Sequence, residues 1–147
     1  MHIRPLCPAD HDTWLALWQN YCAFYHSALP QDVNATLWQR LLDPQSPVNG
    51  LIALDDAGQA LGICHYVCHP HTWSARNVCY LEDLFVSPDA RRMGIASQLI
   101  AALQAQGKRE NWNRIYWITH TDNTAARAVY DRVARRSDHV RYEIALD

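Results

Sequence analysis

The stretch "SPDARRMGIASQLI" (residues 87–100) joins a strand-like run to a helix-like run. The preceding run, "VCYLEDLFV" (residues 78–86), has the length and the β-branched and aromatic content of a buried strand. Beyond the junction, Ile95, Leu99 and Leu103 recur at helical spacing, which predicts an amphipathic helix. The sequence therefore predicts a strand–turn–helix unit whose turn is crowded with arginine and small residues.

The composition of this turn fits an anion-binding helix N-terminus. Such an end presents unpaired backbone N–H groups and the positive end of the peptide dipoles. Gly94 lets a ligand approach the backbone closely, Ala96 is the next smallest choice, and Arg91 and Arg92 add positive charge. The turn therefore suits a phosphate or pyrophosphate, with an ordinary helix start and solvated arginines as the alternative. It matches neither a Walker loop nor a Gly-x-Gly-x-x-Gly turn.

Length and composition narrow the class of protein. The 147 residues, 49% hydrophobic and 19% charged, predict one domain spanning residues 1–147. A net charge of −2 and a pI near 6.4 give no support for a nucleic-acid partner. No apolar run approaches the roughly 20 residues of a membrane helix, and the N-terminal "MHIRPLCPAD" lacks the apolar centre of a signal peptide. Five scattered cysteines favour reduced thiols and a cytoplasmic location.

The remaining segments predict a mixed α/β order, β-α-α-β-β-β-α-β-α-β, with no internal repeat or linker. In the first half of the chain, turn and periodicity signals predict a strand at 2–6, helices at 10–26 and 33–42, and a strand pair turning at "DDAG" (55–58). In the second half they predict a helix to about residue 109, a strand at 114–120, a helix at 122–134 and a last strand at 139–146.

Two landmarks in this chain resemble the GNAT superfamily, the GCN5-related N-acetyltransferases. In "FVSPDARRMGIASQLI", Arg91, Gly94 and Ala96 occupy the marked positions of the acetyl-CoA signature Arg/Gln-x-x-Gly-x-Gly/Ala. In "DNTAARAVYDRV", Asn123 precedes Tyr130 by seven residues, as in the second landmark. "YLEDLFV" further resembles the subgroup of polyamine and yeast-type histone/polyamine acetyltransferases.

The resemblance implies a mixed, mostly antiparallel sheet of six or seven strands, flanked by about four helices and splayed between strands four and five. It implies an acetyl-CoA-dependent N-acetyltransferase that acetylates a primary amine of a small molecule, such as a polyamine or an amino acid, directly in a ternary complex. A homodimer is the expected assembly. The alternatives are a catalytically silent acyl-CoA sensor and a protein or peptide N-acetyltransferase. One departure is Ala134-Arg135 in place of the usual Gly-Phe, which puts the last hairpin in doubt.

Amine acetylation needs a base, because a primary amine is almost wholly protonated at neutral pH, and it needs donors for the leaving thiolate and the oxyanion. The resemblance implies Glu82 as the base and Tyr130 as the donor to sulfur. Strand alternation sends Glu82 and Asp83 to opposite faces unless a bulge intervenes, so the choice of base between them stays open.

The resemblance also implies an acetyl-CoA site. Strand residues pair with the pantetheine arm, the turn holds the pyrophosphate, and Asn123 bonds the pantetheine amides. The predicted set is Leu84, Phe85, Val86, Arg91, Arg92, Met93, Gly94, Ile95, Ala96, Ser97, Asn123 and Tyr130. Beside Glu82, three aromatic residues of the first helix are candidates for the acceptor pocket, with core packing as the alternative: Trp18, Tyr21 and Tyr25.

The segment "CHYVCHPH" (residues 64–71) has the composition of a metal site but not the geometry. In a strand, the two cysteines point to one face and the three histidines to the other, so tetrahedral ligands do not converge. We expect no metal here. The cysteines should pack as small apolar groups, and one or more histidines should lie at the edge of the acceptor pocket.

Overall fold

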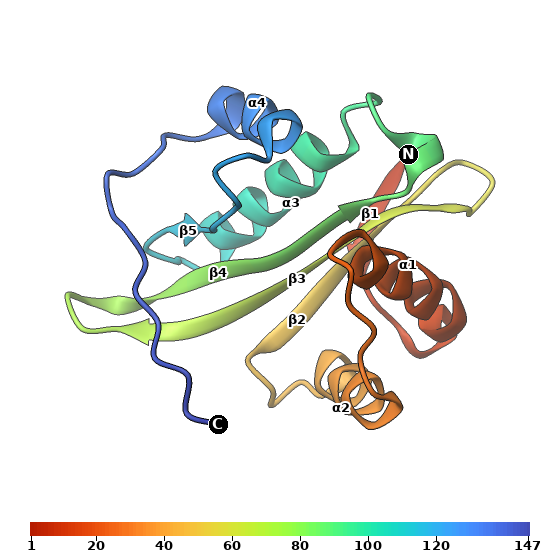
Figure 1. The fold of residues 1–147 in the computed structure, drawn as a ribbon, viewed down its shortest axis with the longest axis horizontal. Helices are drawn as coiled ribbons and strands as arrows, with labels where there is room; N and C mark the ends of the chain where they lie inside the picture. The colour runs from red at the N-terminus through yellow and green to blue at the C-terminus, as the bar shows by residue number, and fades with distance from the viewer.

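The computed structural model describes residues 1–147 and shows a five-stranded sheet between two helical layers (Figure 1). The strands lie side by side in chain order and are β1 (His2–Pro5), β2 (Val48–Leu54), β3 (Ala60–His71), β4 (Ser74–Val86) and β5 (Ile115–Tyr116). Neighbouring strands are antiparallel except β4 and β5, which are parallel.

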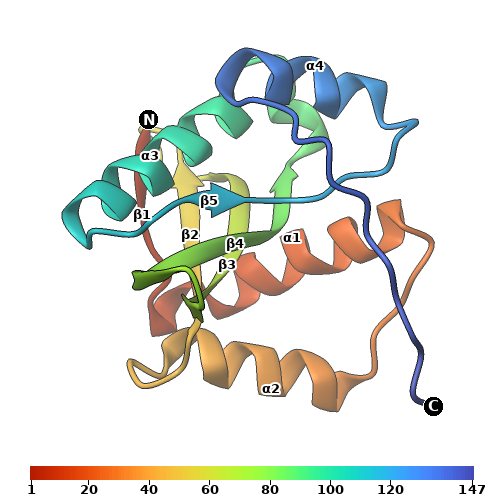
Figure 2. The ribbon, with the colours of Figure 1, turned by 90° about the vertical axis from the view of Figure 1, so that its left-hand side faces the viewer.

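Helices cover both faces of this sheet. Figure 2 shows α1 (His11–Phe24) and α2 (Gln31–Leu42) below it, and α3 (Ile95–Arg109) and α4 (Thr124–Val133) above it. Short 3₁₀ turns, η1 (Pro8–Asp10) and η2 (Pro88–Ala90), precede α1 and the turn into α3. None of these helices is long and apolar enough to cross a membrane.

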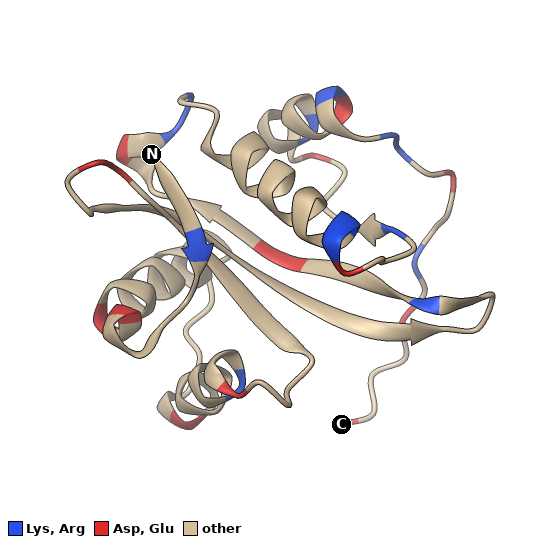
Figure 3. Cartoon of the chain, turned by 180° about the vertical axis from the view of Figure 1, so that it is seen from behind, with Lys and Arg blue, Asp and Glu red and all other residues tan.

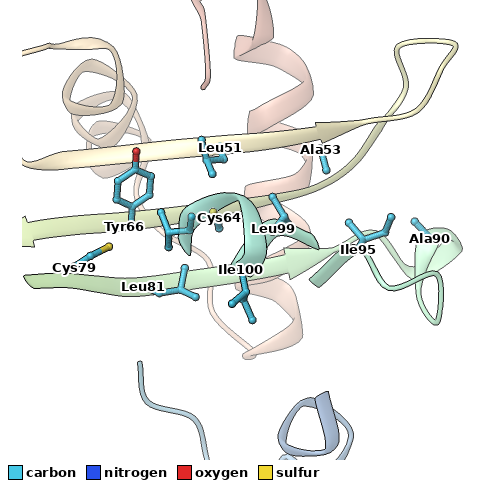
Figure 4. Close-up of a cluster of buried hydrophobic side chains, with 11 residues drawn as sticks. Leu51, Ala53, Cys64, Tyr66, Cys79, Leu81, Ala90, Ile95, Leu99 and Ile100 are labelled. Carbon is cyan, nitrogen blue, oxygen red and sulfur yellow. The ribbon is translucent and has the colours of Figure 1, made fainter. Parts of the chain in front are cut away.

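Two hydrophobic cores hold the layers together, because alternate residues of the central strands point to opposite faces. On the upper face, Ile95, Leu99 and Leu103 of α3 pack over Cys64 and Leu81, and Figure 4 shows this cluster. On the lower face, Trp14 and Trp18 of α1 pack on the sheet. The buried residues of this core are Leu6, Trp14, Leu17, Trp18, Cys22, Leu41, Ile52, Ile63 and Phe85. The predicted helix at 95–109 is confirmed, and its apolar face is the one that is buried.

The predicted mixed α/β class is confirmed, but the expected six or seven strands are wrong, because the sheet has five. The strand predicted at 114–120 is shorter and covers only Ile115–Tyr116. The strand predicted at 139–146 is absent, and the segment continues past the sheet without joining it (Figures 1 and 2). Its alternating residues Val140, Tyr142, Ile144 and Leu146 are 74–95% exposed. Alternating apolar residues form a β-strand only when another strand is available for hydrogen bonding, and no strand pairs with this segment.

The expected splay between the fourth and fifth strands is present. β5 pairs with β4 only at Cys79 and Tyr80, so the β4 edge from Leu81 to Val86 has no neighbouring strand. The departure at Ala134-Arg135 does not prevent α4 from ending, because Ala134 adopts extended backbone (φ −148°, ψ 174°) that any residue tolerates. A glycine stop is therefore not needed here.

Candidate active site

A bulge in β4 sets the positions of the two strand carboxylates. His65 of β3 pairs with Asp83, but the next residue, Tyr66, pairs with Leu81, which leaves Glu82 as an extra residue. These two are the only acidic residues in the strands, and Figure 3 shows them as a red patch in the middle of β4. In a regular strand, adjacent residues point to opposite faces. A bulge at this point is what allows the two carboxylates to lie on one side of the strand. Glu82 is near Asp83 and His65, and partial burial, followed by the Asp83 charge, raises its pKa.

Asp83 lies at the centre of a small polar cluster. Its Oδ2 is 3.0 Å from Nδ1 of His65, which is fully buried. The hydroxyl of Tyr21, on α1, is close enough that burial first and then the Asp83 charge raise its pKa above its ordinary value. Tyr21 is also near Tyr25 and Tyr130. The β4 carboxylates therefore lie beside the last turns of α1.

Tyr130 is held on α4 above the gap between β4 and β5. Its ring meets Trp117 edge to face, with centroids 5.4 Å apart, and burial raises the pKa of its hydroxyl. Asn123 occupies the N-cap position of the same helix, and its Nδ2 donates to Thr119 Oγ1 at 3.3 Å. The seven-residue spacing is two helical turns, so both side chains lie on the same side of α4.

The turn before α3 presents free backbone donors. Arg92 and Gly94 both have left-handed backbone, with φ of 65° and 73°. No backbone N–H from Arg92 to Ser97 donates to a backbone acceptor outside the helix ladder, and no side chain caps the helix. A Cβ at Gly94 would meet nothing closer than Gln98 Nε2 at 3.9 Å, so the space over this backbone is open. Arg91 and Arg92 are exposed beside it, with the Arg91 guanidinium 5.8 Å from the Phe24 ring centre.

These features fit a phosphate-bearing, extended ligand. Free N–H groups and two arginines suit a pyrophosphate, and the unpaired β4 edge from Leu81 to Val86 offers backbone groups to an amide-containing arm. Leu84 and Val86 are half-buried against the upper core, while Phe85 is buried in the lower one. Their backbone, rather than their side chains, is what the edge presents.

No three His, Cys, Asp or Glu side chains are grouped so that they would hold a metal ion. Cys64 and Cys68 pack with the upper core, while His65 points to the lower face. His69 is engaged elsewhere, 2.8 Å from the Tyr116 hydroxyl. A hollow of about 490 Å³ between α3, β5 and the end of α4 includes none of the carboxylates, so it is separate from this cluster.

Comparison with known proteins decides the family. The model of the acetyltransferase (GNAT) family matches residues 13–134. This chain belongs to the GNAT family. The acetyltransferase is 31% identical to the D-amino-acid N-acetyltransferase HPA3 of Saccharomyces cerevisiae, over 96% of this chain and 88% of the yeast protein. It is therefore an acyltransferase that uses acetyl-CoA as its acetyl donor.

Solved structures share the fold of this acetyltransferase. A probable acetyltransferase of known structure superposes with a TM-score of 0.90 at 23% identity, covering 100% of this chain and 99% of the other. The aminoglycoside N-acetyltransferase AAC(6')-Iy, solved in complex with CoA, superposes with a TM-score of 0.83 at 23% identity, covering 99% and 95%. This acetyltransferase thus has the same overall fold as these solved acetyltransferases.

The three aromatic candidates on α1 of the acetyltransferase lie in different surroundings. Trp18 is only 7% exposed, stacks on Tyr21 and donates its indole N–H to Asn34 Oδ1 at 2.9 Å, so it is largely a core residue. Tyr21 lies against Phe85 and near Asp83. Tyr25 is 38% exposed and faces His120, which follows β5.

Sequence reasoning missed the contacts of His65. Strand alternation placed its side chain on the face opposite the cysteines, but not beside a carboxylate. Its pairing with Asp83 depends on the register of β3 against β4, and its other contact, to Trp14, depends on how α1 packs. The only signal in the sequence was a histidine within the otherwise apolar run of residues 60–68.

Proposed function

We propose that this acetyltransferase moves an acetyl group directly from acetyl-CoA to a primary amine of a small molecule, within a ternary complex. The observation that carries this proposal is the opening between β4 and β5, where β4 carries Glu82 and Asp83 at its bulge and Tyr130 of α4 is held against Trp117, which follows β5. A carboxylate able to take a proton and a hydroxyl able to give one are thereby brought to the gap where β4 and β5 separate.

The chain's own residues supply the binding site. The backbone N–H groups of Arg92 to Ser97 and the charges of Arg91 and Arg92 hold the pyrophosphate. Residues Leu84 to Val86 bond the pantetheine arm along the open β4 edge, and Asn123 adds a side-chain amide from the start of α4. When bound, acetyl-CoA supplies a thioester whose acetyl group is the one transferred.

The catalytic work then divides between β4 and α4. Glu82 accepts the proton that makes the amine nucleophilic, directly or through water; at neutral pH that deprotonation costs about 4 kcal/mol for an amine of pKa about 10. Its raised pKa suits this task, because a base is most effective when its pKa approaches the working pH. A β4 backbone N–H stabilises the developing oxyanion, and the Tyr130 hydroxyl donates a proton to the departing sulfur.

A cationic amine suits the acceptor side. Glu82 and Asp83 place two carboxylates beside Tyr21 and Tyr25, a combination that favours an ammonium group over a neutral or anionic acceptor. The yeast relative is named for D-amino acids and the structural relative for aminoglycosides, both of which carry primary amines. Amino acids, polyamines and amino sugars are therefore the acceptor classes that we expect.

We also propose that residues 1–147 act as one domain, that the enzyme is a homodimer and that it works in the cytoplasm. The dimer is supported by the C-terminal segment, residues 135–147, which exposes four alternating apolar side chains on a segment that pairs with no strand. A second copy of this chain is the partner that would cover them. The cytoplasmic location is supported by the five cysteines, all of which are free thiols.

A panel of amines tests the proposed function. Purified protein is mixed with acetyl-CoA and with single amines from the three classes or with short peptides, and thiol release is measured. We expect release with at least one cationic small amine and an intersecting-line pattern when both substrates are varied. Binding of acetyl-CoA without release for any amine would instead favour the silent sensor, and release only with peptides would favour a peptide acetyltransferase.

A further inference from the structure

We propose that Trp14 and His65 are positioning residues that fix the Asp83 carboxylate so that it holds the ammonium group of the acceptor beside Glu82. The inference rests on the proposed function, because it assigns part of the same acceptor site. Trp14 comes from α1, His65 from β3 and Asp83 from β4, and their side chains form a continuous chain of two hydrogen bonds.

The hydrogen-bond directions in this chain are fixed by chemistry. The indole Nε1–H of Trp14 lies 2.9 Å from Nε2 of His65, and an indole nitrogen only donates. Nε2 of His65 must therefore be the acceptor, which leaves the ring proton on Nδ1. Nδ1–H in turn donates to Asp83 Oδ2 at 3.0 Å. Trp14 thus selects the tautomer of His65, and that tautomer orients Asp83.

Burial makes this arrangement rigid. Trp14 is 0% exposed and His65 is 1% exposed, so no water competes for either ring nitrogen. In the other neutral tautomer, the Nε2–H would face the Trp14 N–H and the Nδ1 lone pair would face the carboxylate. Two buried hydrogen bonds would be lost together, each leaving polar atoms unpaired. In the observed arrangement no buried side-chain polar atom lacks a partner.

The position of the chain in the fold gives it a role in the site. Asp83 pairs with His65 directly beside the bulged residue Glu82, and its side chain remains partly open to solvent, with 18% exposure. Because His65 occupies Oδ2, Oδ1 remains able to accept a hydrogen bond from an ammonium group. Tyr21, beside Asp83, lies two helical turns from Trp14 on the same side of α1. The hydrogen bond from Trp14 to His65 therefore also holds Tyr21 against Asp83.

The test begins with the tautomer itself. Histidine-selective ¹⁵N NMR of the wild-type protein reports which ring nitrogen of His65 carries the proton, with a His65→Gln sample identifying the signal. We expect a neutral ring protonated at Nδ1, and in Trp14→Phe we expect this preference to weaken. A ring protonated at Nε2 in the wild type would overturn the proposal, whatever the enzyme's activity.

Two substitutions at His65 separate its two hydrogen bonds. His65→Gln keeps an acceptor near Nε2 for Trp14 but removes the donor to Asp83, whereas His65→Asn keeps a donor near Nδ1 but removes the acceptor. We expect KM for the amine to rise at least tenfold in His65→Gln and less in His65→Asn, with the acetyl-CoA Kd unchanged in both. Equal effects of the two variants, or an unchanged amine KM in His65→Gln, would overturn the positioning role.

A double-mutant cycle guards against a purely structural effect. If His65 acts through Asp83, His65→Gln should add little to the rise in amine KM already caused by Asp83→Asn. Additive effects would contradict the proposal, even if both variants fold. If no amine is acetylated by the wild type, the proposed function fails, while the NMR result still decides whether the Trp14–His65–Asp83 chain has the inferred direction.

Discussion

Trp117 and Tyr130 meet edge to face, with ring centroids 5.4 Å apart and planes at 70°. Trp117 follows β5, and Tyr130 lies in the middle of α4, so this contact fixes the helix over the open side of the sheet. The ring of Tyr130 therefore has a packing role that is separable from the chemistry of its hydroxyl.

Tyr130→Phe separates these two roles. The phenyl ring keeps the contact with Trp117, but no hydroxyl remains to protonate the departing sulfur. We expect kcat to fall about 100-fold while the acetyl-CoA Kd stays the same. Steady-state kinetics and calorimetry measure both quantities, and Tyr66→Phe, which removes a hydroxyl bonded to Gln106 of α3 rather than one at the gap between β4 and β5, is the control. Unchanged turnover in Tyr130→Phe would remove Tyr130 from the mechanism.

Glu82→Gln tests the base. Partial burial and the Asp83 charge raise the pKa of Glu82, and only its deprotonated form accepts a proton. In the wild type, kcat/KM should therefore fall as the pH drops through this raised pKa, at a higher pH than for an ordinary glutamate. The variant should be slower and should lack this limb of the pH–rate profile. A profile with the same acidic limb would point to another base.

Gly94→Val tests the turn before α3. The added side chain fills the open space over the backbone N–H groups, so we expect the acetyl-CoA Kd to rise at least tenfold. Gly58→Val is the matched control, because Gly58 has a similar left-handed φ of 83° and open surroundings but lies in the β2–β3 hairpin. Calorimetry on both variants measures the difference. Equal Kd values would contradict a pyrophosphate site at this turn.

The ion pair between Arg4 and Asp10 makes the stability of the fold depend on pH. Arg4 donates two hydrogen bonds to its carboxylate, at 2.7 and 2.8 Å, and lowers the pKa of Asp10 from 3.8 to about 2. Because the pKa is lower in the folded state, the charged carboxylate stabilises the fold at pH values above the pKa of the unfolded state. This stabilisation, about 2 kcal/mol, is lost as the pH falls from about 4 to about 2. Urea unfolding should show Asp10→Asn to be less stable at pH 7, with the difference shrinking toward pH 2. Asp12→Asn, at a fully exposed carboxylate, should show no such pH dependence.

The C-terminal segment tests the dimer. Replacing Tyr142 and Ile144 with aspartate puts charge on its apolar side, so we expect a dimer of the wild-type protein to dissociate. Analytical ultracentrifugation measures the mass of each species. Glu143→Ala, on the alternate side of the segment, should remain dimeric. A monomeric wild type would refute the proposed assembly.

Much of the fold follows from local pattern. The helix after the turn at 91–94, the β2–β3 strand pair and the amphipathic first helix each bury the face that their periodicity indicates. The last predicted strand fails for a physical reason: a strand exists only with a partner, and the alternation at 139–146 says nothing of whether one is within reach. The same limit shortened the strand predicted at 114–120, because β5 separates from β4 after two residues.

The sequence by itself determined the chemistry that is present: the spacing of Arg91, Gly94 and Ala96, the Asn123–Tyr130 pair and the adjacent carboxylates are local features, readable along the chain. Only the tertiary structure decided which groups meet. The bulge at Glu82, and the hydrogen bond between Asp83 and His65, depend on the register of β3 against β4. Register is settled by burial across the whole sheet, so residues far apart in the chain determine it together.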